Sequence, residues 1–414
     1  MFETLFHSPT VIARHQRAPF VEERRRYLVH CAQQGYSRAM LLLQARELLW
    51  AAHKLQMYPD LRLTLAQITA VAHDWEERRR CGGHALNEVW TQQRFVQVTR
   101  AWLRFLGCFH VPTAPVPFAE QLDAYLTWMA HERGLAATTI EQTRRYLGQF
   151  LRWYGGRGRA LAAIHLTDID AFLREGSTKG WCRTSVNNMA TALRGFFRYG
   201  AVQGWCPPTL APAIHGPRRF AFESLPLGPA WPEVQRLLAS LETARPGDIR
   251  DRAMLMLFAI YGLRASEVAQ LRLDDLDWDH DLLRVARAKR HSPQLYPLVA
   301  TVGNALLRYI RHVRPACGHR AVFLSLVPPI RPLSRSALYN LTRTHFQTLG
   351  IHATHLGPHA LRHSCATRLA AAGVSLKAIG DHLGHRSPSA TRIYTKVDLP
   401  ALRQVAAFDV GELL

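Results

Sequence analysis

Residues 358–394 read PHALRHSCATRLAAAGVSLKAIGDHLGHRSPSATRIY, and this segment decides the fold and the chemistry that we expect. It contains His359 and Arg362, then His385 and Tyr394. Residues three apart share one face of a helix, so His359 and Arg362 should point in the same direction. Arginine is the side chain best suited to bidentate contact with a phosphate. The segment therefore indicates a site for a phosphate-bearing substrate.

A second arginine comes from Gly262-Leu263-Arg264-Ala265-Ser266-Glu267, and Lys289 stands in a basic turn between two predicted strands. Phosphodiester exchange builds negative charge on the non-bridging oxygens and on the leaving 5′ oxygen, so its catalysis is mostly positioning and electrostatic stabilisation. Two guanidiniums could clamp the phosphate, a cation could protonate the leaving oxygen, and a phenol could attack. This set of side chains needs no metal ion.

In order and spacing these residues resemble the motifs of the tyrosine recombinases, the phage integrase family, over about residues 115–400. The resemblance implies a site-specific DNA recombinase that cleaves and religates DNA through a 3′-phosphotyrosyl intermediate and a Holliday junction, without metal, ATP or another cofactor. It assigns the catalytic roles to Arg264, Lys289, His359, Arg362, His385 and Tyr394. It also gives Glu267 a supporting role, orienting Arg264 or another group of the site.

The chain departs from the family pattern at one point. Family members commonly have Gly-Lys-Gly in this hairpin, whereas this chain has Ala288-Lys289-Arg290, which makes Arg290 a rival DNA contact. Three other functions stay open: a type IB topoisomerase-like enzyme, a DNA-binding partner recombinase that does not cut, and a metal-dependent nuclease. The pairs His359/His363 and His382/His385 could suggest zinc, but no His-Glu-x-x-His signature accompanies them, so we expect no metal.

The charge balance supports a polyanionic partner. The 414 residues include 52 Lys and Arg against 31 Asp and Glu, a formal net charge of +21. Neutralising phosphates releases counterions, so such a surplus favours DNA, although a basic proteome could also explain it. The 7 cysteines form no C-x-x-C pair, and we see neither a leader peptide nor 18 consecutive apolar residues. We expect a cytoplasmic protein that binds double-stranded DNA, works as a homo- or hetero-tetramer, and does not enter a membrane.

Proline-rich stretches near residues 112–117 and 207–219 predict two domain boundaries. The fold class that we expect is mainly α with a small antiparallel β-sheet in the catalytic domain. The predicted parts are an N-terminal helical domain at 1–110, a core-binding (SAM-like) helical domain at 115–205, a linker at 206–224 and the catalytic tyrosine recombinase domain at 225–414.

The middle part has amphipathic helical patterns. Thr138 and Glu141 predict a capping box, and Thr167 with Asp170 predicts a short helix through Phe172. The faces opposite the apolar stripes carry the candidate DNA-binding residues Arg144, Arg145, Arg152, Arg194 and Arg198. A solvated basic face is the alternative interpretation.

Residues 1–110 repeat features of the middle part at offsets of roughly 94–103 residues. For example, Leu65–Val71 parallels Leu166–Phe172, and Arg100–Phe105 parallels Arg194–Tyr199. The pattern suggests a duplicated helical unit, for extra DNA or for a neighbouring subunit, although amphipathic helices share some pattern by chance.

The last part should contain an apolar helix at 249–261, strands at 281–287 and 294–299, and helices near 301–314, 335–349, 359–371 and 376–381. Ser387 and Pro388 predict the start of the helix that bears Tyr394. The segment 399–414 could dock onto a neighbouring subunit, as in the family, or pack on its own domain.

Overall fold

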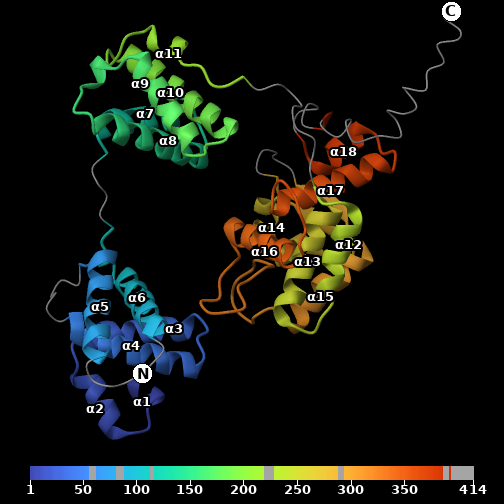
Figure 1. The fold of residues 1–414 in the computed structure, drawn as a ribbon. Coiled ribbons are helices and arrows are strands. Elements are labelled where there is room, and N and C mark those ends of the chain that lie inside the picture. The colour runs from blue at the N-terminus through green and yellow to red at the C-terminus, as the bar shows by residue number, and fades with distance from the viewer. Residues whose placement is uncertain are drawn as a thin grey trace, which may run out of the picture. The chain divides into compact units, whose positions relative to one another are not determined.

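The computed structural model describes residues 1–55, 62–80, 88–111, 116–218, 228–287, 293–385 and 391–392. Most of these residues are helical (Figure 1), and one antiparallel sheet with the strand order β1-β2-β3 accompanies them, which confirms the predicted fold class. The chain forms two compact units, Met1–Phe109 with Ser224–Leu414, and His110–Glu223. Within the part of the chain that the structure describes, none of the helices has the length and apolar character needed to cross a membrane.

Residues 1–109 form a helical module with its own hydrophobic core, which includes Leu28, Leu48 and Trp102. Its helices are α1 (Phe2–Leu5), α2 (Pro9–Arg17), α3 (Val21–Gln33), α4 (Arg38–Leu55), α5 (Leu65–Arg80) and α6 (Glu88–Phe105). Helix α6 packs against α3, α4 and α5. Arg24 is buried in this module, and its Nε and Nη2 donate hydrogen bonds to the carbonyl oxygens of His15, Ala18 and Pro19, which compensates part of the loss of its hydration.

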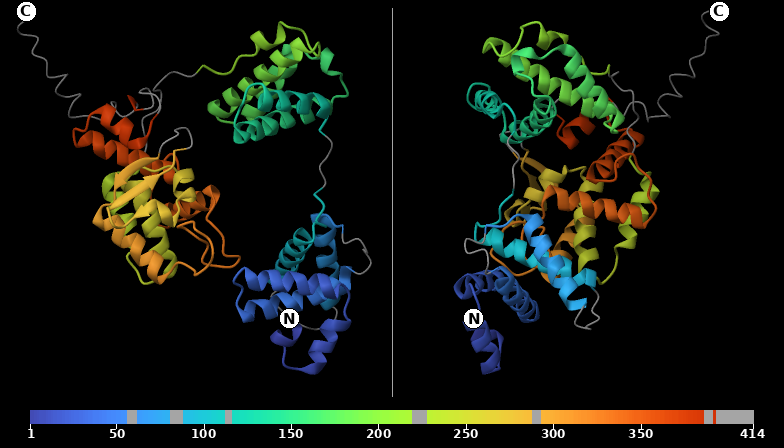
Figure 2. Two further views of the ribbon diagram at one scale, coloured as in Figure 1. Left: turned by 180° about the vertical axis from the view of Figure 1, so that it is seen from behind. Right: turned by 60° about the vertical axis from the view of Figure 1, so that its left-hand side comes forward.

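The second unit is a helical module around the buried aromatic side chains of Phe150, Phe196 and Phe197. Its helices are α7 (Ala119–His131), α8 (Ala137–Gly155), α9 (Leu166–Thr178), α10 (Arg183–Val202) and α11 (Leu210–Ala213), with the 3-10 turn η1 (Leu161–Ala163) between α8 and α9. Figure 2 shows the green helices of this unit from two further directions.

Two predicted helix starts in this unit are wrong. The N-cap of α8 is Ala136, without a side-chain cap, so Thr138 lies inside the first turn. Helix α9 begins one residue before Thr167 and is longer than predicted, and its capping box joins His165 and Asp168. The backbone N–H of Leu135 donates to the carbonyl of Met129, and this tight connection from α7 ends directly before Ala136.

Residues 228–385 correspond to the predicted catalytic domain and are called the catalytic region below. Their core is built around α13 (Pro246–Ile260), which packs on α15 (Ala300–His312) and α17 (Pro358–Ala371). Buried residues occur all round α13, as expected of a central helix. The other helices are α12 (Trp231–Ser240), α14 (Ala265–Gln270), α16 (Arg335–Thr348) and α18 (Leu376–Leu383), with the 3-10 turn η2 (Leu273–Asp275). The helices predicted between residues 249 and 381 are confirmed within a few residues at their ends, whereas the predicted helix that bears Tyr394 and the segment 399–414 lie outside the described residues.

The sheet consists of β1 (Leu276–Asp277), β2 (Leu282–Val285) and β3 (Gln294–Pro297), of which β1 was not predicted. Strands β2 and β3 are antiparallel, with Leu283 opposite Tyr296 and Val285 opposite Gln294. Side chains alternate between the two faces of a strand. Leu283, Val285 and Arg287 are all buried, so the alternation continues past the end of β2 and directs Arg287 inward.

Candidate active site

Arg264 stands at the N-cap of α14, directly after the turn at Gly262 and Leu263. Its backbone N–H donates to Oε2 of Glu267 at 2.7 Å, and its Nη1 donates to Oε1 of the same carboxylate at 2.7 Å. Its Nη2 donates to the carbonyl oxygen of Gly384 at 3.0 Å. The side chain is still 41% exposed, so a held guanidinium faces the solvent and can receive a phosphate.

Arg362 lies in α17, and its side chain, like that of Arg264, extends to the C-terminal end of α18. Its Nη1 donates to the carbonyl oxygen of Gly262, and its Nη2 donates to that of Leu383 at 2.7 Å. Arg362 is only 2% exposed, so these carbonyl groups take the place of water around its charge. The two predicted clamp arginines are therefore fixed by neighbouring carbonyl groups at the end of α18.

Helix α18 ends at Gly384, whose φ of +63° is left-handed. The backbone N–H of His385 donates to the carbonyl of Gly380 at 2.8 Å, in the manner of a Schellman ending. The Nδ1 of His385 lies 2.8 Å from Oγ1 of the buried Thr391. Burial, together with the charges of Arg362 and Arg264, lowers the pKa of His385 to about 4. His385 is thus neutral at pH 7, and it directly follows Leu383 and Gly384, whose carbonyl groups hold Arg362 and Arg264.

Glu267 is the carboxylate that pairs with Arg264, and it also pairs with Arg287. The sequence motifs did not identify Arg287 as a residue of the site. Nη1 of Arg287 donates to Oε1 of Glu267 at 2.6 Å, and both side chains are almost completely buried. Burial acts to raise the pKa of Glu267, but the hydrogen bond from the backbone of Arg264 and the charge of Arg287 outweigh it and lower this pKa. One ionised carboxylate therefore lies between two arginines.

Arg287 also connects the β-hairpin to the end of α18. Its Nε donates to Oε1 of Gln294 at 3.1 Å, and its Nη2 donates to the hydroxyl of Tyr296 and to the carbonyl of His382. The hydroxyl of Tyr296 and the amide of Gln294 donate to that carbonyl as well. A signal for Arg287 was present in the sequence, because a charge in the inward position after Leu283 and Val285 needs a buried partner.

Histidines line the other side of the site. The ring of His359 lies edge-to-face with that of His363, with 4.4 Å between centroids. Desolvation in the pocket, the charge of Arg362 and the proximity of His355 lower the pKa of His359. Burial and the neighbouring His359 lower the pKa of His363 to about 4. These imidazoles are neutral at pH 7, so His359 can accept a proton.

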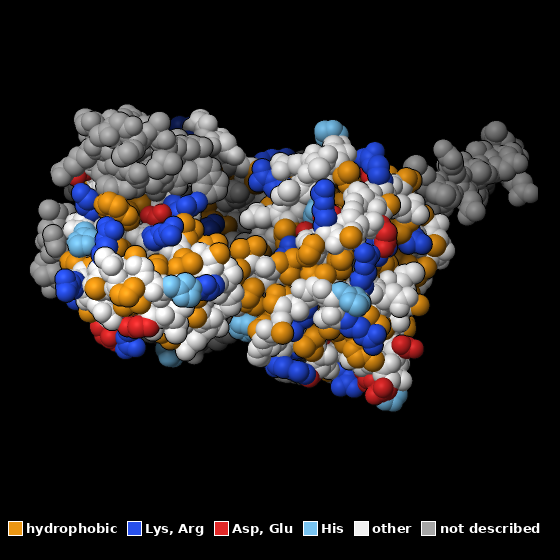
Figure 3. Space-filling view, turned by 90° about the horizontal axis from the view of Figure 1, so that it is seen from below, with side chains coloured by type: hydrophobic (Ala, Val, Ile, Leu, Met, Phe, Trp, Pro, Cys, Tyr) orange, Lys and Arg blue, Asp and Glu red, His pale blue; other side chains and the backbone are white. Residues whose placement is uncertain are grey.

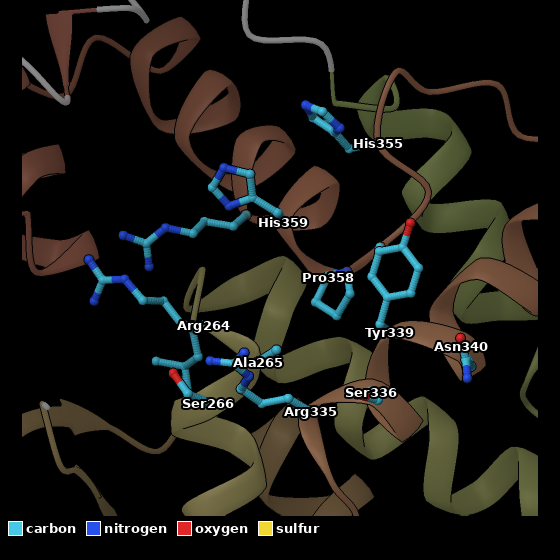
Figure 4. Close-up of a pocket in the computed structure, with 13 residues that line it drawn as sticks. Arg264, Ala265, Ser266, Arg335, Ser336, Tyr339, Asn340, His355, Pro358 and His359 are labelled. Carbon is cyan, nitrogen blue, oxygen red and sulfur yellow. The ribbon is translucent and has the colours of Figure 1, made fainter. Parts of the chain in front are cut away.

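A cavity of about 660 Å³ opens over these groups, and Arg264, His359 and Arg362 line it. In Figure 4, the side chains of Arg264 and His359 extend into the same space, and the ring of Tyr339 lies beside Pro358 at the start of α17. Arg335, Tyr339 and His355 also line the cavity, and the sequence motifs did not identify them. A Cβ at Gly357 would come within 2.4 Å of the Tyr339 ring, so a larger residue there would displace that ring from the cavity wall.

Three of the predicted residues, Lys289, Arg290 and Tyr394, lie outside the described residues. Of the predicted DNA contacts, Arg144, Arg145 and Arg152 are exposed on α8, where Arg144 pairs with Asp123 at 2.9 Å. On α10, Arg198 is exposed, and the half-buried Arg194 donates to the carbonyl of Ile214 at 3.3 Å. Among the described residues, His, Cys, Asp and Glu form no group of three or more that could hold a metal ion.

Comparison with known proteins agrees with this fold. The profile of the Phage integrase family matches residues 232–399, and that of the phage integrase N-terminal SAM-like domain matches residues 122–204. An integrase/recombinase of Sinorhizobium fredii, y4rA, is 35% identical over 300 residues, which cover 72% of this chain and 73% of that protein. Tyrosine recombinase XerD of Xanthomonas axonopodis pv. citri is 32% identical over 300 residues, covering 70% of this chain and 96% of XerD.

Two solved structures share the fold. XerH site-specific recombinase bound to palindromic difH substrate has a TM-score of 0.56 and 21% identity, covering 82% of this chain and 96% of XerH. A lambda integrase dimer bound to a COC′ core site has a TM-score of 0.54 and 19% identity, covering 67% and 94% respectively. The similarity in sequence to y4rA and XerD, over more than two thirds of this chain, defines the class as tyrosine recombinase. The chain belongs to the phage integrase family, enzymes that break and rejoin DNA in site-specific recombination.

Proposed function

We propose that the chain cuts duplex DNA by attack of the Tyr394 hydroxyl on a phosphodiester, forming a 3′-phosphotyrosyl link and releasing a 5′ hydroxyl. The observation that carries the proposal is the convergence of Arg264 and Arg362 on the end of α18, beside His385 and His359. A phosphate bound there would meet two guanidiniums from different helices. Their charge would stabilise the additional negative charge that gathers on the phosphoryl oxygens in the transition state.

The protons balance within the same set of side chains. A phenol has a pKa near 10 in water, so it needs a base and nearby cations. His359 would accept the proton of Tyr394 as the new oxygen–phosphorus bond forms, and Lys289 would protonate the 5′ oxygen as the old bond breaks. His385 would donate a hydrogen bond to a non-bridging oxygen. The bond energy is kept in the protein–DNA ester, so religation by another 5′ hydroxyl needs no ATP.

Strand exchange between two duplexes would then proceed through a Holliday junction in a tetramer of recombinase subunits on double-stranded DNA. The core-binding module would hold the duplex through α8 and α10, with Arg145, Arg152 and Arg198 exposed for phosphate contact. A type IB topoisomerase would use the same cleavage chemistry but would relax supercoils at unrelated sites. That difference can be measured.

The test uses the full chain with nicked duplex fragments tiled across the DNA that flanks its own gene, in EDTA. The expected result is a denaturation-resistant protein–DNA adduct on particular fragments, absent with Tyr394→Phe although this variant still shifts the same fragments in a gel. An equal adduct with Tyr394→Phe would remove Tyr394 as the nucleophile. Equal adduct on every fragment, with relaxation of an unrelated supercoiled plasmid, would favour the topoisomerase.

A further inference from the structure

The helical module at residues 1–109 has the same plan as the core-binding module that follows it. Helices α3, α4, α5 and α6 correspond in order and approximate length to α7, α8, α9 and α10. The packed pairs also correspond, since α3 contacts α4 and α6 as α7 contacts α8 and α10, and both α4 and α5 contact α6 as α8 and α9 contact α10. The SAM-like profile covers only residues 122–204, so it assigns nothing to the first module.

Rare backbone features recur at equivalent places. Phe20, with φ of +54°, precedes α3, and Phe118, with φ of +60°, precedes α7. A bulky residue seldom adopts a left-handed conformation, so this match is far more specific than helix order. The starts of α5 and α9 agree as well, because Thr64 and Gln67 exchange the hydrogen bonds of a capping box there, as in the second module.

The packing of aromatic rings repeats in the same way. In the first module, Tyr27 and His30 of α3 meet Phe105 of α6, with ring centroids 5.4 Å and 4.8 Å from Phe105. In the second, Tyr125 and Trp128 of α7 meet Tyr199 of α10 at 5.5 Å and 5.2 Å. The second trio lines a hollow among residues of its own module, whereas the hollow at Tyr27, His30 and Phe105 is also lined by Pro328, Pro329 and Arg331. Three correspondences in backbone, capping and ring packing point to duplication rather than to chance similarity of helices.

We propose that residues 1–109 are a second core-binding module and provide an additional binding site for duplex DNA through α4 and α6. This inference rests on the proposed function, because it takes the basic residues of α8 and α10 as DNA contacts. It goes beyond that function because each protomer would then have two separate helical modules that bind duplex DNA.

The basic residues of α8 and α10 have counterparts in the first module. When the buried positions of the helices are matched, exposed Arg46 of α4 corresponds to exposed Arg145, and exposed Arg104 of α6 corresponds to exposed Arg198. Half-buried Arg100 corresponds to half-buried Arg194.

Charge over the whole module also favours a polyanion. Residues 1–109 contain fifteen Lys and Arg against nine Asp and Glu. Figure 3 shows Lys and Arg side chains spread over the visible surface of the protein, with fewer Asp and Glu among them. A protein partner would need an equally acidic surface, whereas any duplex supplies closely spaced phosphates.

The experiment measures binding of the full chain to a 60-base-pair duplex at several salt concentrations, with the double variant Arg46→Glu/Arg104→Glu. The matched control is Arg17→Glu/Arg25→Glu, which makes the same change of charge at exposed positions of the same module. Arg17 lies on α2, outside the repeated helices, and the counterpart of Arg25 is Asp123. Arg46→Lys/Arg104→Lys keeps the charge.

We expect the first variant to weaken binding at least tenfold and to shorten the nuclease-protected stretch, while the control stays within about threefold. The slope of log K against log salt should fall by about 2, since each lost phosphate contact removes about 0.9. The lysine variant should bind nearly as the native chain does. Equal losses in the first variant and the control would overturn the inference, because only total charge would then matter.

Two outcomes distinguish a second DNA-binding site from a contact with another subunit, and distinguish failure of this inference from failure of the proposed cleavage. If Arg46→Glu/Arg104→Glu leaves the salt slope and the protected length unchanged but lowers the mass of the sedimenting protein–DNA complex, the module contacts a subunit and the inference is wrong. If no version of the chain forms a covalent adduct, yet the double variant alone loses protection, the proposed cleavage fails while the second DNA site stands.

Discussion

Replacing Glu267 by Gln should destabilise the catalytic region strongly. The carboxylate is 4% exposed and accepts hydrogen bonds from Nη1 of Arg264 at 2.7 Å and Nη1 of Arg287 at 2.6 Å. Arg287 is itself 3% exposed, so an amide at position 267 would leave a buried cation without a counter-charge. Breaking a buried pair in this way costs about 3–5 kcal/mol. Because the amide keeps one acceptor oxygen, we expect the lower end, about 3 kcal/mol.

The chain supplies a matched control in Glu242. This carboxylate also pairs with two arginines, with Arg252 at 2.6 Å and Arg308 at 3.1 Å, but it is 54% exposed. Water screens such surface pairs and replaces their hydrogen bonds, so Glu242→Gln should cost less than about 1 kcal/mol. The two variants remove the same charge and the same number of ion pairs; they differ in burial and in the backbone N–H of Arg264, which Glu267 also accepts.

The measurement is amide hydrogen exchange in α13 as a function of urea in the full chain, because that helix reports on the catalytic core alone. Glu267→Gln should lower the free energy of opening of these amides by about 3 kcal/mol, several times the effect of Glu242→Gln. It should also reduce the yield of covalent adduct, since Arg264 loses its anchor. If both variants change the exchange of α13 equally, Glu267 does not neutralise a buried charge, and the account of the site is wrong.

Three further predictions concern the end of α18. Arg362→Lys cannot reach both carbonyl groups that the fork now holds, so adduct formation should fall at least 100-fold in a nicked-substrate assay, while binding in a gel shift stays within about fivefold. Gly384→Ala would place a Cβ 2.7 Å from Cζ of Arg287, whereas Gly373→Ala has the same left-handed strain with open space around it. Thermal unfolding should therefore show a loss of about 1–2 kcal/mol at Gly373 and a larger loss at Gly384. The pKa of His385 is about 4 in the folded chain, so the unfolded chain binds a proton first as pH falls. Melting temperature should drop between pH 6.5 and pH 4, and a drop that is no smaller in His385→Asn would contradict this.

The short motifs could be predicted because their residues are neighbours in sequence. Arg264 and Glu267 are three apart, as are His359 and Arg362, so a single turn of helix brings each pair together. Arg287 could not be assigned in the same way, since its partner lies twenty residues earlier and its contact at His382 lies ninety-five later. Only the register of the β-hairpin brings these three segments together.

Helix starts were less predictable than the helices themselves. The Thr138–Glu141 pair has the sequence of a capping box, but the connection from α7 sets the start of α8 at Ala136 instead. A cap is worth about 1 kcal/mol, so the packing of two helices joined by a short loop can override it. Helix α9 begins ahead of Thr167 for a different reason, because His165 and Asp168 form its capping box.

The end of α18 explains why Leu383-Gly384-His385 belongs to the catalytic pattern at all. A helix that ends at a left-handed glycine leaves its last carbonyl groups unpaired, and these carry the negative end of the helix dipole. Here the carbonyl groups of His382, Leu383 and Gly384 accept from Arg287, Arg362 and Arg264, which come from three separate segments. The arginines are thus fixed before any phosphate arrives, so DNA binding need not order them. His385 directly follows the carbonyl groups that hold Arg264 and Arg362. A residue at position 384 that extended α18 by one turn would move the imidazole of His385 and would also remove the carbonyl acceptor that Gly384 offers to Arg264.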